Sequence, residues 1–583
     1  MNAKVPPFTR ASQDITFRSS HQPDQHVRTL LIPLGVIALF LVFLARLFQL
    51  TIVKGTYYQY IAEDNRIREI LIPAQRGTVY DRKGRVVTQS VEKQVMNDIL
   101  GRPIPSFVRS YPTRGALGHV LGYMHSVSPK QLQTDACLEP LRMNDRVGVD
   151  GIERLYECHL RGRKGKILVE VDSYGKAIKT LSRVEARPGK ALKLSIDSTL
   201  QEKLNEAIEA DSIKVSDAFT LKEKRIGVVG LKPQTGEVLV LYSNPTFDSN
   251  DFETGSSNTQ KYFTDKNKPL FNRALLGTYP PGSVFKPVVA VGALEEKVIK
   301  EDETITDNGF IQAGPIKFHN WYFTKYGKTD GEVDVRMALK RSNDIYFYTI
   351  GERLTPQKIK QWSHTFGFGK KTGIELADAS GSIPSDFWKR EVVGEKWYTG
   401  DTYNLSIGQG YLLTTPIQIA QATATIANNG TRCRPTILKA DAKENTPLVA
   451  QKESCTQLDI SDDTLTAVRE GMLQACQSGG TGWPFFTFAV DGVPISVGCK
   501  TGTAEAHKAH TEPYAWFTIF APYDKPEIAL AILVEDAGEG SNVAAPIAKL
   551  LLTEYFSHSS RAKPSKTITI TPTQSPKAPP ETD

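Results

Sequence analysis

The sequence predicts an α/β (α+β) fold in which one sheet is assembled from strands at both ends of a long domain. Two strand-like runs, IGVVGLK and GEVLVLYS, come first and form a candidate hairpin. A largely helical stretch follows, and then three more strand-like runs, PISVGCKTGTAE, YAWFTIFAP and IALAILVEDA, precede a helical run, APIAKLLLTEYF. Because strands and helices must bury their apolar faces against one another, we expect a single sheet covered by helices.

Length and composition indicate a folded protein of several domains. The chain has 583 residues, of which 40% are hydrophobic and 23% charged, so it can bury a large core and global disorder is excluded. The net charge of +7 fits contact with an anionic membrane or wall surface, and a solvated basic surface explains it equally well. Since no basic stripe is interleaved with aromatic residues, we expect no nucleic-acid partner.

One segment near the N-terminus predicts a membrane anchor. Thr29 to Val53 is apolar apart from Arg46, and a stretch of that length spans a bilayer about 30 Å thick. The long side chain of Arg46 can reach the interface. No small-residue cleavage pattern follows, which argues against a removable signal peptide. Residues 1–28 are polar and are predicted to form a disordered cytoplasmic tail, although the basic residues on both sides of the span leave its orientation open.

Residues 54–190 are predicted to form an N-terminal domain of short strands and helices. Alternating apolar residues between Asn65 and Val87, broken by glycine turns, indicate strands. Gly151 to Lys166 is typical of a helix ended by glycine.

A second domain is predicted over residues 191–557. From Ala191 to Ala210 we expect a strand, a helix cap at Asp197 or Ser198 and an amphipathic helix. Residues 558–583 are rich in Pro, Ser, Thr and Lys and predict a second disordered tail.

The cysteines do not indicate a metal site. There are six of them: Cys137, Cys158, Cys433, Cys455, Cys476 and Cys499. No pair has the Cys-x-x-Cys spacing, and an even number outside the cytosol permits disulfides without selecting a pairing. Cys499 lies in an apolar strand-like run, so we expect a buried free thiol there.

Ser283 and Lys286 form the first candidate catalytic motif, Ser-x-x-Lys, within YPPGSVFKP. The spacing alone is common by chance and would indicate an ordinary surface segment. Here Pro-Pro-Gly predicts a stiff turn directly before the serine, and the helix-compatible run VVAVGALEE follows. A serine in the first helical turn lies near backbone N–H groups that stabilise anionic oxygen. A neutral Lys286 on the same helix face can take the Ser283 proton, provided that burial or a nearby cation lowers its pKa.

The second candidate motif is Ser342-Asn343-Asp344, in the helix-like run KRSNDIYFY. A second hydroxyl can relay a proton toward a leaving amine, and Asp344 or Asn343 can hold the hydrogen bonds of a site. The competing interpretation is an ordinary helix N-cap, which this segment on its own favours.

The third candidate motif is Lys500-Thr501-Gly502, between the strand-like runs PISVGC and AWFTIF. A lysine and a threonine on a strand edge can bind a substrate carboxylate, and the glycine leaves room for a substrate backbone to pair along the strand. Lys371-Thr372-Gly373 has the same letters but lies in a glycine-rich stretch without strand alternation. We therefore interpret the segment at 371–373 as a surface loop.

These three motifs in this order are the pattern of penicillin-recognising serine enzymes. On these residues the chain resembles class B penicillin-binding proteins of the elongation type, which are monofunctional peptidoglycan D,D-transpeptidases. The resemblance runs from Arg46 to Phe556 and includes IPAQRGTVYDRKGRV, SIDSTLQ, PLFNRALLGTYPPGSVFKP and GDTYNLSIGQGYLLTTPIQIA. It implies the fold shared with serine β-lactamases, an antiparallel sheet with a helical insert, behind an elongated N-terminal pedestal with a dimerisation-like domain at residues 54–190.

The resemblance also implies roles for the motif residues. Ser283 would attack the penultimate D-Ala carbonyl of a stem peptide, with Lys286 as general base and Ser342 and Asp344 organising proton transfer. β-Lactams would acylate the same serine.

For substrate binding, the resemblance assigns Lys500 and Thr501 to the donor carboxylate, with Lys500 also counted among the catalytic residues. Asn343, Gly502 and Thr503 would line the substrate site. The backbone N–H groups of Ser283 and Thr503 would form the oxyanion hole.

Partners and location follow from the same resemblance. It implies a SEDS-family glycosyltransferase and rod-complex scaffold proteins as partners, and a single-pass protein of the cytoplasmic membrane with its catalytic domain outside. We expect no cofactor. Some relatives carry a histidine-bound zinc near the second motif, but the corresponding stretch here reads YGKTDG, and although His319 and Asp330 are near it we predict no metal. The segment from Gln89 to Arg109 is shorter than the usual head insertion, which leaves partner docking there open.

Three alternatives remain open at this stage. One is a division-type class B protein, and another is a carboxypeptidase or a class D-like β-lactamase, which would transfer the acyl group to water. The third is a catalytically inactive scaffold for wall synthesis.

Overall fold

The computed structural model describes residues 25–97, 101, 103–172, 174–213, 215, 219–439, 455–505 and 512–557. The disordered tails predicted at 1–28 and 558–583 lie outside these residues, except for residues 25–28, which begin the first helix. The chain divides into two units. One consists of residues 1–71, 98–102 and 166–184, and the other of residues 72–97, 103–165 and 185–583.

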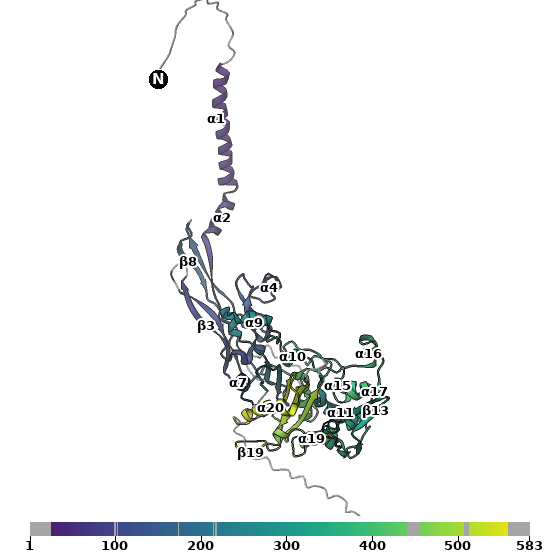
Figure 1. Ribbon diagram of the computed structural model, residues 1–583. Coiled ribbons are helices and arrows are strands. Elements are labelled where there is room, and N and C mark those ends of the chain that lie inside the picture. The colour runs from purple at the N-terminus through teal and green to yellow at the C-terminus, as the bar shows by residue number, and fades with distance from the viewer. Residues whose placement is uncertain are drawn as a thin grey trace, which may run out of the picture. The chain divides into compact units, whose positions relative to one another are not determined.

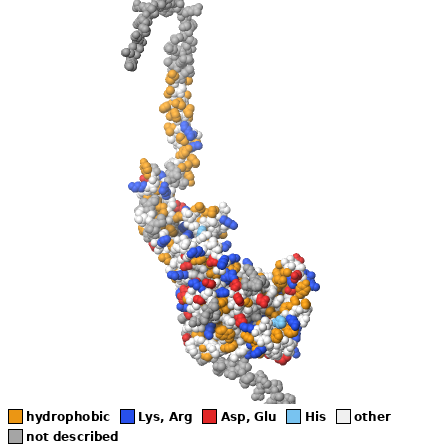
Figure 2. Space-filling view, viewed as in Figure 1, with side chains coloured by type: hydrophobic (Ala, Val, Ile, Leu, Met, Phe, Trp, Pro, Cys, Tyr) orange, Lys and Arg blue, Asp and Glu red, His pale blue; other side chains and the backbone are white. Residues whose placement is uncertain are grey.

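The first unit carries the apolar helix that the sequence predicts between Thr29 and Val53. Helix α1 (Gln25–Phe48) continues through a π-helical turn, η1 (Gln49–Val53), into α2 (Gly55–Arg66). Within the described residues, Ile32–Val53 is the one helical stretch long and apolar enough to cross a membrane, and its apolar side chains are exposed (Figure 2, orange). This exposure is what a lipid-facing helix requires, because the apolar surface has no protein partner within the chain.

A three-stranded sheet completes the first unit, in the order β1-β7-β8. Its strands are β1 (Ile67–Ile72), β7 (Gly165–Val171) and β8 (Ala177–Val184). Arg66, the last residue of α2, forms an ion pair with Glu170 of β7 at 2.5 Å. This contact joins the end of the helical segment to the sheet.

The second unit begins with a four-stranded sheet in the order β4-β3-β2-β9. Its strands are β2 (Val79–Tyr80), β3 (Val86–Asn97), β4 (Pro103–Ser110) and β9 (Leu192–Lys193). Strands β3 and β4 form an antiparallel hairpin, with Gln89 opposite Ser110 and Asn97 opposite Pro103. The hairpin occupies the region where the sequence predicts a shortened head.

A buried ionic cluster stabilises the helical segment that follows. Glu153 is fully buried, and its two carboxylate oxygens lie 2.6 Å from Arg76 Nε and 2.7 Å from Arg109 Nε. The single helix predicted from Gly151 to Lys166 is instead broken at Tyr156 into α5 (Gly151–Leu155) and α6 (Glu157–Leu160). Short elements around it are η2 (Arg114–Leu117), α3 (Gly118–Leu121), β5 (Met124–Ser126), α4 (Pro129–Thr134) and β6 (Arg146–Gly148).

The main sheet of the second unit confirms the prediction of one sheet built from both ends of the domain. Its order is β11-β10-β22-β21-β20, and every neighbouring pair is antiparallel. The strands are β10 (Ile226–Leu231), β11 (Val238–Asn244), β20 (Gly498–Ala504), β21 (Tyr514–Ala521) and β22 (Ile528–Val534). Ile226 of β10 lies opposite Val534 of β22, so the first and last strands of the domain are joined at the centre.

Both faces of the main sheet are covered. On β22, Ile528, Leu530 and Ile532 pack in the core beneath α7 (Ser198–Glu209) and α20 (Gly540–Ser557), while the small side chains of Ala529 and Ala531 face the helical insert. This alternation is the period-two pattern of a strand buried on both faces. Figure 1 shows α20 beside the yellow-green strands. Helix α7 begins at the predicted cap, where the Asp197 side chain accepts from the Thr199 N–H.

The helical insert lies between β11 and β20 in sequence. Helix α18 packs directly on the sheet, and α11 packs among α14, α15 and α19. The elements of the insert are α8 (Ser249–Thr254), α9 (Asn258–Thr264), α10 (Arg273–Leu276), η3 (Gly282–Phe285), α11 (Lys286–Glu295), β12 (Ile305–Asp307), β13 (Phe310–Ala313), β14 (Ile316–His319), α12 (Trp321–Tyr326), β15 (Gly331–Val333), α13 (Val335–Arg341), α14 (Asp344–Leu354), α15 (Pro356–Thr365), α16 (Asp386–Val392), α17 (Thr399–Ser406), α18 (Pro416–Ala427), β16 (Thr431–Cys433), β17 (Cys455–Gln457), α19 (Asp462–Ala475), η5 (Trp483–Phe485), β18 (Ala489–Val490) and β19 (Val493–Pro494).

The prediction of a free thiol at Cys499 is wrong. All six cysteines are paired, as Cys137–Cys158, Cys433–Cys455 and Cys476–Cys499. Cys499 is fully buried, as predicted for an apolar strand, but the end of α19 brings Cys476 against β20. An apolar environment suits a disulfide as well as a thiol, so burial alone could not distinguish them.

Candidate active site

Ser283 lies in a 3₁₀ turn, η3, that leads directly into α11. The turn follows Pro280 and Pro281, and Gly282 has a φ of +56°, a conformation that favours glycine. Ser283 itself is half-buried, and its hydroxyl forms no hydrogen bond with another described residue. The nucleophile predicted from the sequence is therefore accessible, at the start of a helix whose following residues are buried.

Ser342, Asn343 and Asp344 lie at the junction of two helices, as the N-cap interpretation predicts and not within one helix-like run. Ser342 ends α13 in a left-handed conformation with a φ of +57°, and Asn343 caps α14 by accepting from the Tyr346 N–H at 2.9 Å. The structure confirms the N-cap interpretation for Asn343, and the catalytic role of Ser342 and Asp344 stays a prediction. The Asn343 oxygen serves as an ordinary N-cap, while the side chains of Ser342 and Asp344 face the first motif.

Lys286 is fully buried and contacts the second motif through three oxygens. Its Nζ atom lies 2.6 Å from Asp344 Oδ1, 2.8 Å from the Ser342 carbonyl oxygen and 3.4 Å from the Ser342 hydroxyl. Burial lowers the pKa of Lys286, although the Asp344 carboxylate acts in the opposite direction. A lysine with a lowered pKa is the condition that the sequence analysis set for a general base.

Lys500 contacts the same hydroxyl. Its Nζ atom donates to the Ser342 hydroxyl oxygen at 2.7 Å and to the Thr501 carbonyl oxygen at 3.1 Å. Burial lowers the pKa of Lys500 well below its usual range, and the charge of Lys286 lowers it further. Lys286, Ser342 and Lys500, from three distant parts of the sequence, thus form one buried hydrogen-bond network.

Strand β20 is the edge strand of the main sheet, and η3 packs beside it. A Cβ atom at Gly282 would lie 2.9 Å from the Thr503 carbonyl oxygen, and one at Gly502 would lie 3.0 Å from Val284 Cγ1. The two glycines therefore permit close approach of the turn that carries Ser283 and the strand that carries Thr501 and Thr503. Thr501 also donates to the Thr481 hydroxyl at 2.8 Å, while Thr503 is exposed.

A carboxylate that no sequence motif indicates, Asp307, organises the second motif. Asp307, at the end of β12, is buried and accepts four hydrogen bonds, from the N–H groups of Gly309 and Asp330 and from the side-chain amides of Asn320 and Asn343. Asn320 in turn accepts from the Asp344 N–H, and the Trp321 N–H donates to Asp344 Oδ2 at 3.0 Å. No local pattern pointed to Asp307, because its partners come from three separate segments.

The second Lys-Thr-Gly segment lies in a loop that has no contact with this network. Thr372 is nonetheless buried, and both its N–H and its hydroxyl donate to Asp378 Oδ2, at 2.7 and 2.8 Å. The prediction of a loop at residues 371–373 is confirmed, but a surface position is wrong for Thr372. The buried hydroxyl stabilises the loop itself.

His319 and Asp330 do not form a metal-binding group. His319 ends β14 and stacks against Phe323, whereas Asp330 binds Asn343 and Arg341. Within the described ranges, no group of three or more His, Cys, Asp and Glu side chains is placed to hold a metal ion.

Comparison with known families gives two matches. The family described as penicillin-binding protein transpeptidase domain matches residues 226–553, and the penicillin-binding protein dimerisation domain matches residues 102–194. Among curated relatives, the peptidoglycan D,D-transpeptidase MrdA of Haemophilus influenzae is 30% identical, with 91% of each chain covered.

Solved structures are similar over nearly the whole chain. Pseudomonas aeruginosa PBP2 in complex with WCK 5153 is 31% identical with a TM-score of 0.70, covering 86% of this chain and 99% of that one. PBP2 of Helicobacter pylori in complex with MreC is 27% identical with a TM-score of 0.70, covering 84% and 99%. A peptidoglycan synthase complex described as coordinating polymerization and crosslinking contains a chain that is 26% identical with a TM-score of 0.69, covering 91% and 98%.

Proposed function

The chain belongs to the penicillin-binding protein transpeptidase family, and from this premise we propose that it is a peptidoglycan D,D-transpeptidase of the elongation type, acting through an acyl-serine intermediate. The observation that carries this proposal is the network in which Ser342 joins Lys286 to Lys500, beside the turn that presents Ser283. A nucleophile, a buried amine and a second hydroxyl are the groups that acyl transfer through serine requires.

In the first half of the reaction, the Ser283 hydroxyl attacks the carbonyl carbon of the penultimate D-Ala of a stem peptide. Lys286 in its neutral form accepts the hydroxyl proton, and burial favours this neutral form. The C–N bond to the terminal D-Ala breaks as that proton passes through Ser342 to the leaving amine. The backbone N–H groups of Ser283 and Thr503 stabilise the oxyanion.

In the second half, an amine of a neighbouring stem peptide attacks the acyl-serine ester. Its proton returns through the same groups, the new amide bond forms and the Ser283 hydroxyl is regenerated. Donor binding precedes both halves: the donor peptide pairs with the edge strand β20 alongside Gly502, and Lys500 and Thr501 hold the carboxylate of its terminal D-Ala until that residue leaves. A β-lactam presents a similar carbonyl and carboxylate, so it acylates the same serine.

For location, the exposed apolar helix α1 supports a single-pass membrane anchor. The proposed orientation places the N-terminus in the cytoplasm and the catalytic domain on the outer side of the cytoplasmic membrane, because the cross-linked substrate lies there. Domain boundaries at residues 54–190 and 191–557 are part of the same proposal.

For partners, the similar PBP2 from Helicobacter pylori is solved with MreC, and another similar chain belongs to a peptidoglycan synthase complex. By analogy we assign this chain a rod-complex scaffold protein and a SEDS-family glycosyltransferase as partners.

The test of the proposed function is labelling with fluorescent penicillin, followed by mapping of the adduct. We expect a single stable adduct at Ser283 that is absent from Ser283→Ala. An adduct at another residue, or labelling of Ser283→Ala, would contradict the mechanism. Rapid release of hydrolysed penicillin would instead support a β-lactamase.

A further inference from the structure

A shallow surface pocket of about 580 Å³ lies along α15, apart from the three motifs. It is lined by Gln357, Lys360, Gln361, His364, Thr365, Lys370, Arg432 and Leu458. Five of these residues belong to α15, and the others come from the loop after it, from β16 and from the residue after β17. None is a motif residue, so the catalytic reaction does not account for their arrangement.

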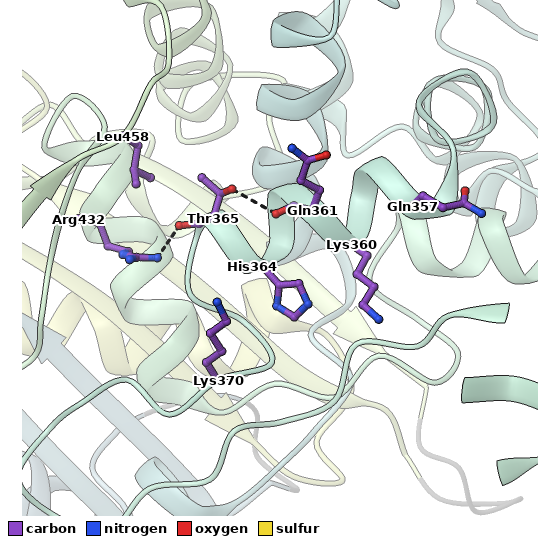
Figure 3. Close-up of a pocket in the computed structure, with 8 residues that line it drawn as sticks. All are labelled: Gln357, Lys360, Gln361, His364, Thr365, Lys370, Arg432 and Leu458. Atoms are coloured by element: carbon purple, nitrogen blue, oxygen red, sulfur yellow. Dashed lines mark hydrogen bonds between the residues drawn. The ribbon is translucent and has the colours of Figure 1, made fainter. Parts of the chain in front are cut away.

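The lining of this pocket is basic and contains no carboxylate. Figure 3 shows Lys360, His364, Lys370 and Arg432 with their nitrogen-bearing ends along one side of the pocket. The ammonium groups of Lys360 and Lys370 form no ion pair or hydrogen bond with any other described residue. By contrast, Lys358 on the same helix pairs with Glu296 at 2.9 Å.

Arg432 and His364 also line the pocket, and each already has one nitrogen hydrogen-bonded within the protein. One guanidinium nitrogen of Arg432 donates to the Thr365 carbonyl oxygen at 2.5 Å, and burial without a neighbouring carboxylate lowers the pKa of Arg432. His364 Nδ1 lies 3.1 Å from the Phe368 carbonyl oxygen. Because a carbonyl can only accept, Nδ1 carries the proton; in the neutral ring Nε2 is then an acceptor, so the oxyanion donors in this pocket are the two lysines and Arg432.

Unpaired cations around one pocket repel one another, and a bound oxyanion removes that repulsion while gaining charge-assisted hydrogen bonds. We propose that this pocket binds an oxyanion, and that the ligand is a carboxylate of a peptidoglycan stem peptide other than the one bound at Ser283. The identity of the ligand rests on the proposed function, which brings the domain against a wall polymer rich in peptide carboxylates. The side-chain amides of Gln357 and Gln361 can form hydrogen bonds with the peptide groups beside that carboxylate.

The test uses the full-length protein in detergent, first acylated with penicillin so that the Ser283 site is filled. A soluble disaccharide-tripeptide is titrated by calorimetry. We expect saturable binding that weakens at high salt, and a loss of at least about tenfold in affinity in Lys360→Gln/Lys370→Gln, since that variant loses two charge-assisted hydrogen bonds. Lys371→Gln is the matched control, because Lys371 is exposed beside Lys370 and does not line the pocket.

Three results would overturn the inference: no binding to the acylated protein, equal binding by the double variant, or an equal loss in Lys371→Gln. A parallel titration with inorganic phosphate separates the two sources of oxyanion. Binding of phosphate without binding of the disaccharide-tripeptide would overturn the assignment to a peptide carboxylate. Penicillin acylation of the same proteins tests the proposed function separately. If Ser283 forms a normal penicillin adduct but the disaccharide-tripeptide does not bind, the proposed function stands and only the oxyanion site is contradicted.

Discussion

The Ser342 hydroxyl oxygen accepts a 2.7 Å hydrogen bond from Lys500 Nζ, and the same oxygen lies 3.4 Å from Lys286 Nζ. One hydroxyl therefore joins the two buried amines. We expect Ser342→Ala to slow acylation by penicillin by about 10²- to 10⁴-fold, the usual contribution of positioned proton transfer, measured by stopped-flow fluorescence. Ser461→Ala, which removes the N-cap of α19 instead, should leave the rate near that of the wild type. Equal rates in both variants would exclude a relay through Ser342.

The pH dependence of acylation follows from the environment of Lys286. Burial lowers the pKa of this lysine, and a general base acts only when it is unprotonated. The acylation rate should therefore rise with pH through the Lys286 pKa and level off below the range of an exposed lysine, about 10.4. The measurement is the acylation rate over roughly pH 5 to 10.

The Asp344 carboxylate favours the charged form of Lys286, so it raises the pKa that burial lowers. Asp344→Asn removes that anion. We expect the midpoint of the pH profile to move to lower pH, whatever happens to the plateau rate. A midpoint that stays in place, or that moves to higher pH, would show that the profile reports another group.

Asp307 is predicted to act as a positioning residue. Two of the four hydrogen bonds that it accepts come from Asn343, within the Ser342–Asp344 turn, and from Asn320, which accepts from the Asp344 N–H. Asp307→Asn replaces an acceptor with a donor that faces other donors, so we expect a loss of about 1–3 kcal/mol in the free energy of unfolding, together with an altered pH profile of acylation. Asp334→Ala, which removes the cap of α13, should lower stability without changing that profile. Matching profiles in the two variants would reduce Asp307 to a purely structural role.

Gly408 should be intolerant of a side chain because of its contact with the turn before Ser283. It has a φ of +77°, and a Cβ atom there would lie 2.2 Å from the Gly282 carbonyl oxygen. Gly408→Ala must displace that turn, and we expect acylation to slow by about 10²-fold. Gly410→Ala is a matched control with a φ of +70° but a nearest approach of 3.3 Å, to Asn404 Cβ. Both variants should lose some stability, measured by urea unfolding. Only Gly408→Ala should also slow acylation by penicillin.

The sequence predicted the sheet because its strands are continuous apolar runs bounded by turns, and it directed attention to Lys286, Ser342 and Lys500 because each lies in a short recognisable motif. Asp307, Thr481 and Gly408 could not be found in this way. Each acts through contacts with residues distant in sequence, among them Asn343 for Asp307, Thr501 for Thr481 and Gly282 for Gly408. The start of α14 was indicated only by the N-cap interpretation of Ser342-Asn343-Asp344, because the apolar pattern continues through the break between α13 and α14 while the backbone of Ser342 turns left-handed.

The disulfide between Cys476 and Cys499 is expected to stabilise the edge strand that carries Lys500. It joins the end of α19 to β20 across a separation of 23 residues, and closing a loop of this size in the unfolded chain corresponds to about 3 kcal/mol. Cys476→Ser/Cys499→Ser should therefore unfold at lower urea concentration than the wild type, and dithiothreitol should destabilise the wild type more than the variant. Cys137→Ser/Cys158→Ser provides the comparison, since that disulfide lies outside the transpeptidase match. Cys499 directly precedes Lys500, so loss of the Cys476–Cys499 bond should also slow acylation by penicillin, whereas loss of the Cys137–Cys158 bond should not. Equal acylation rates in the two double variants would show that the edge strand holds its position without the cross-link.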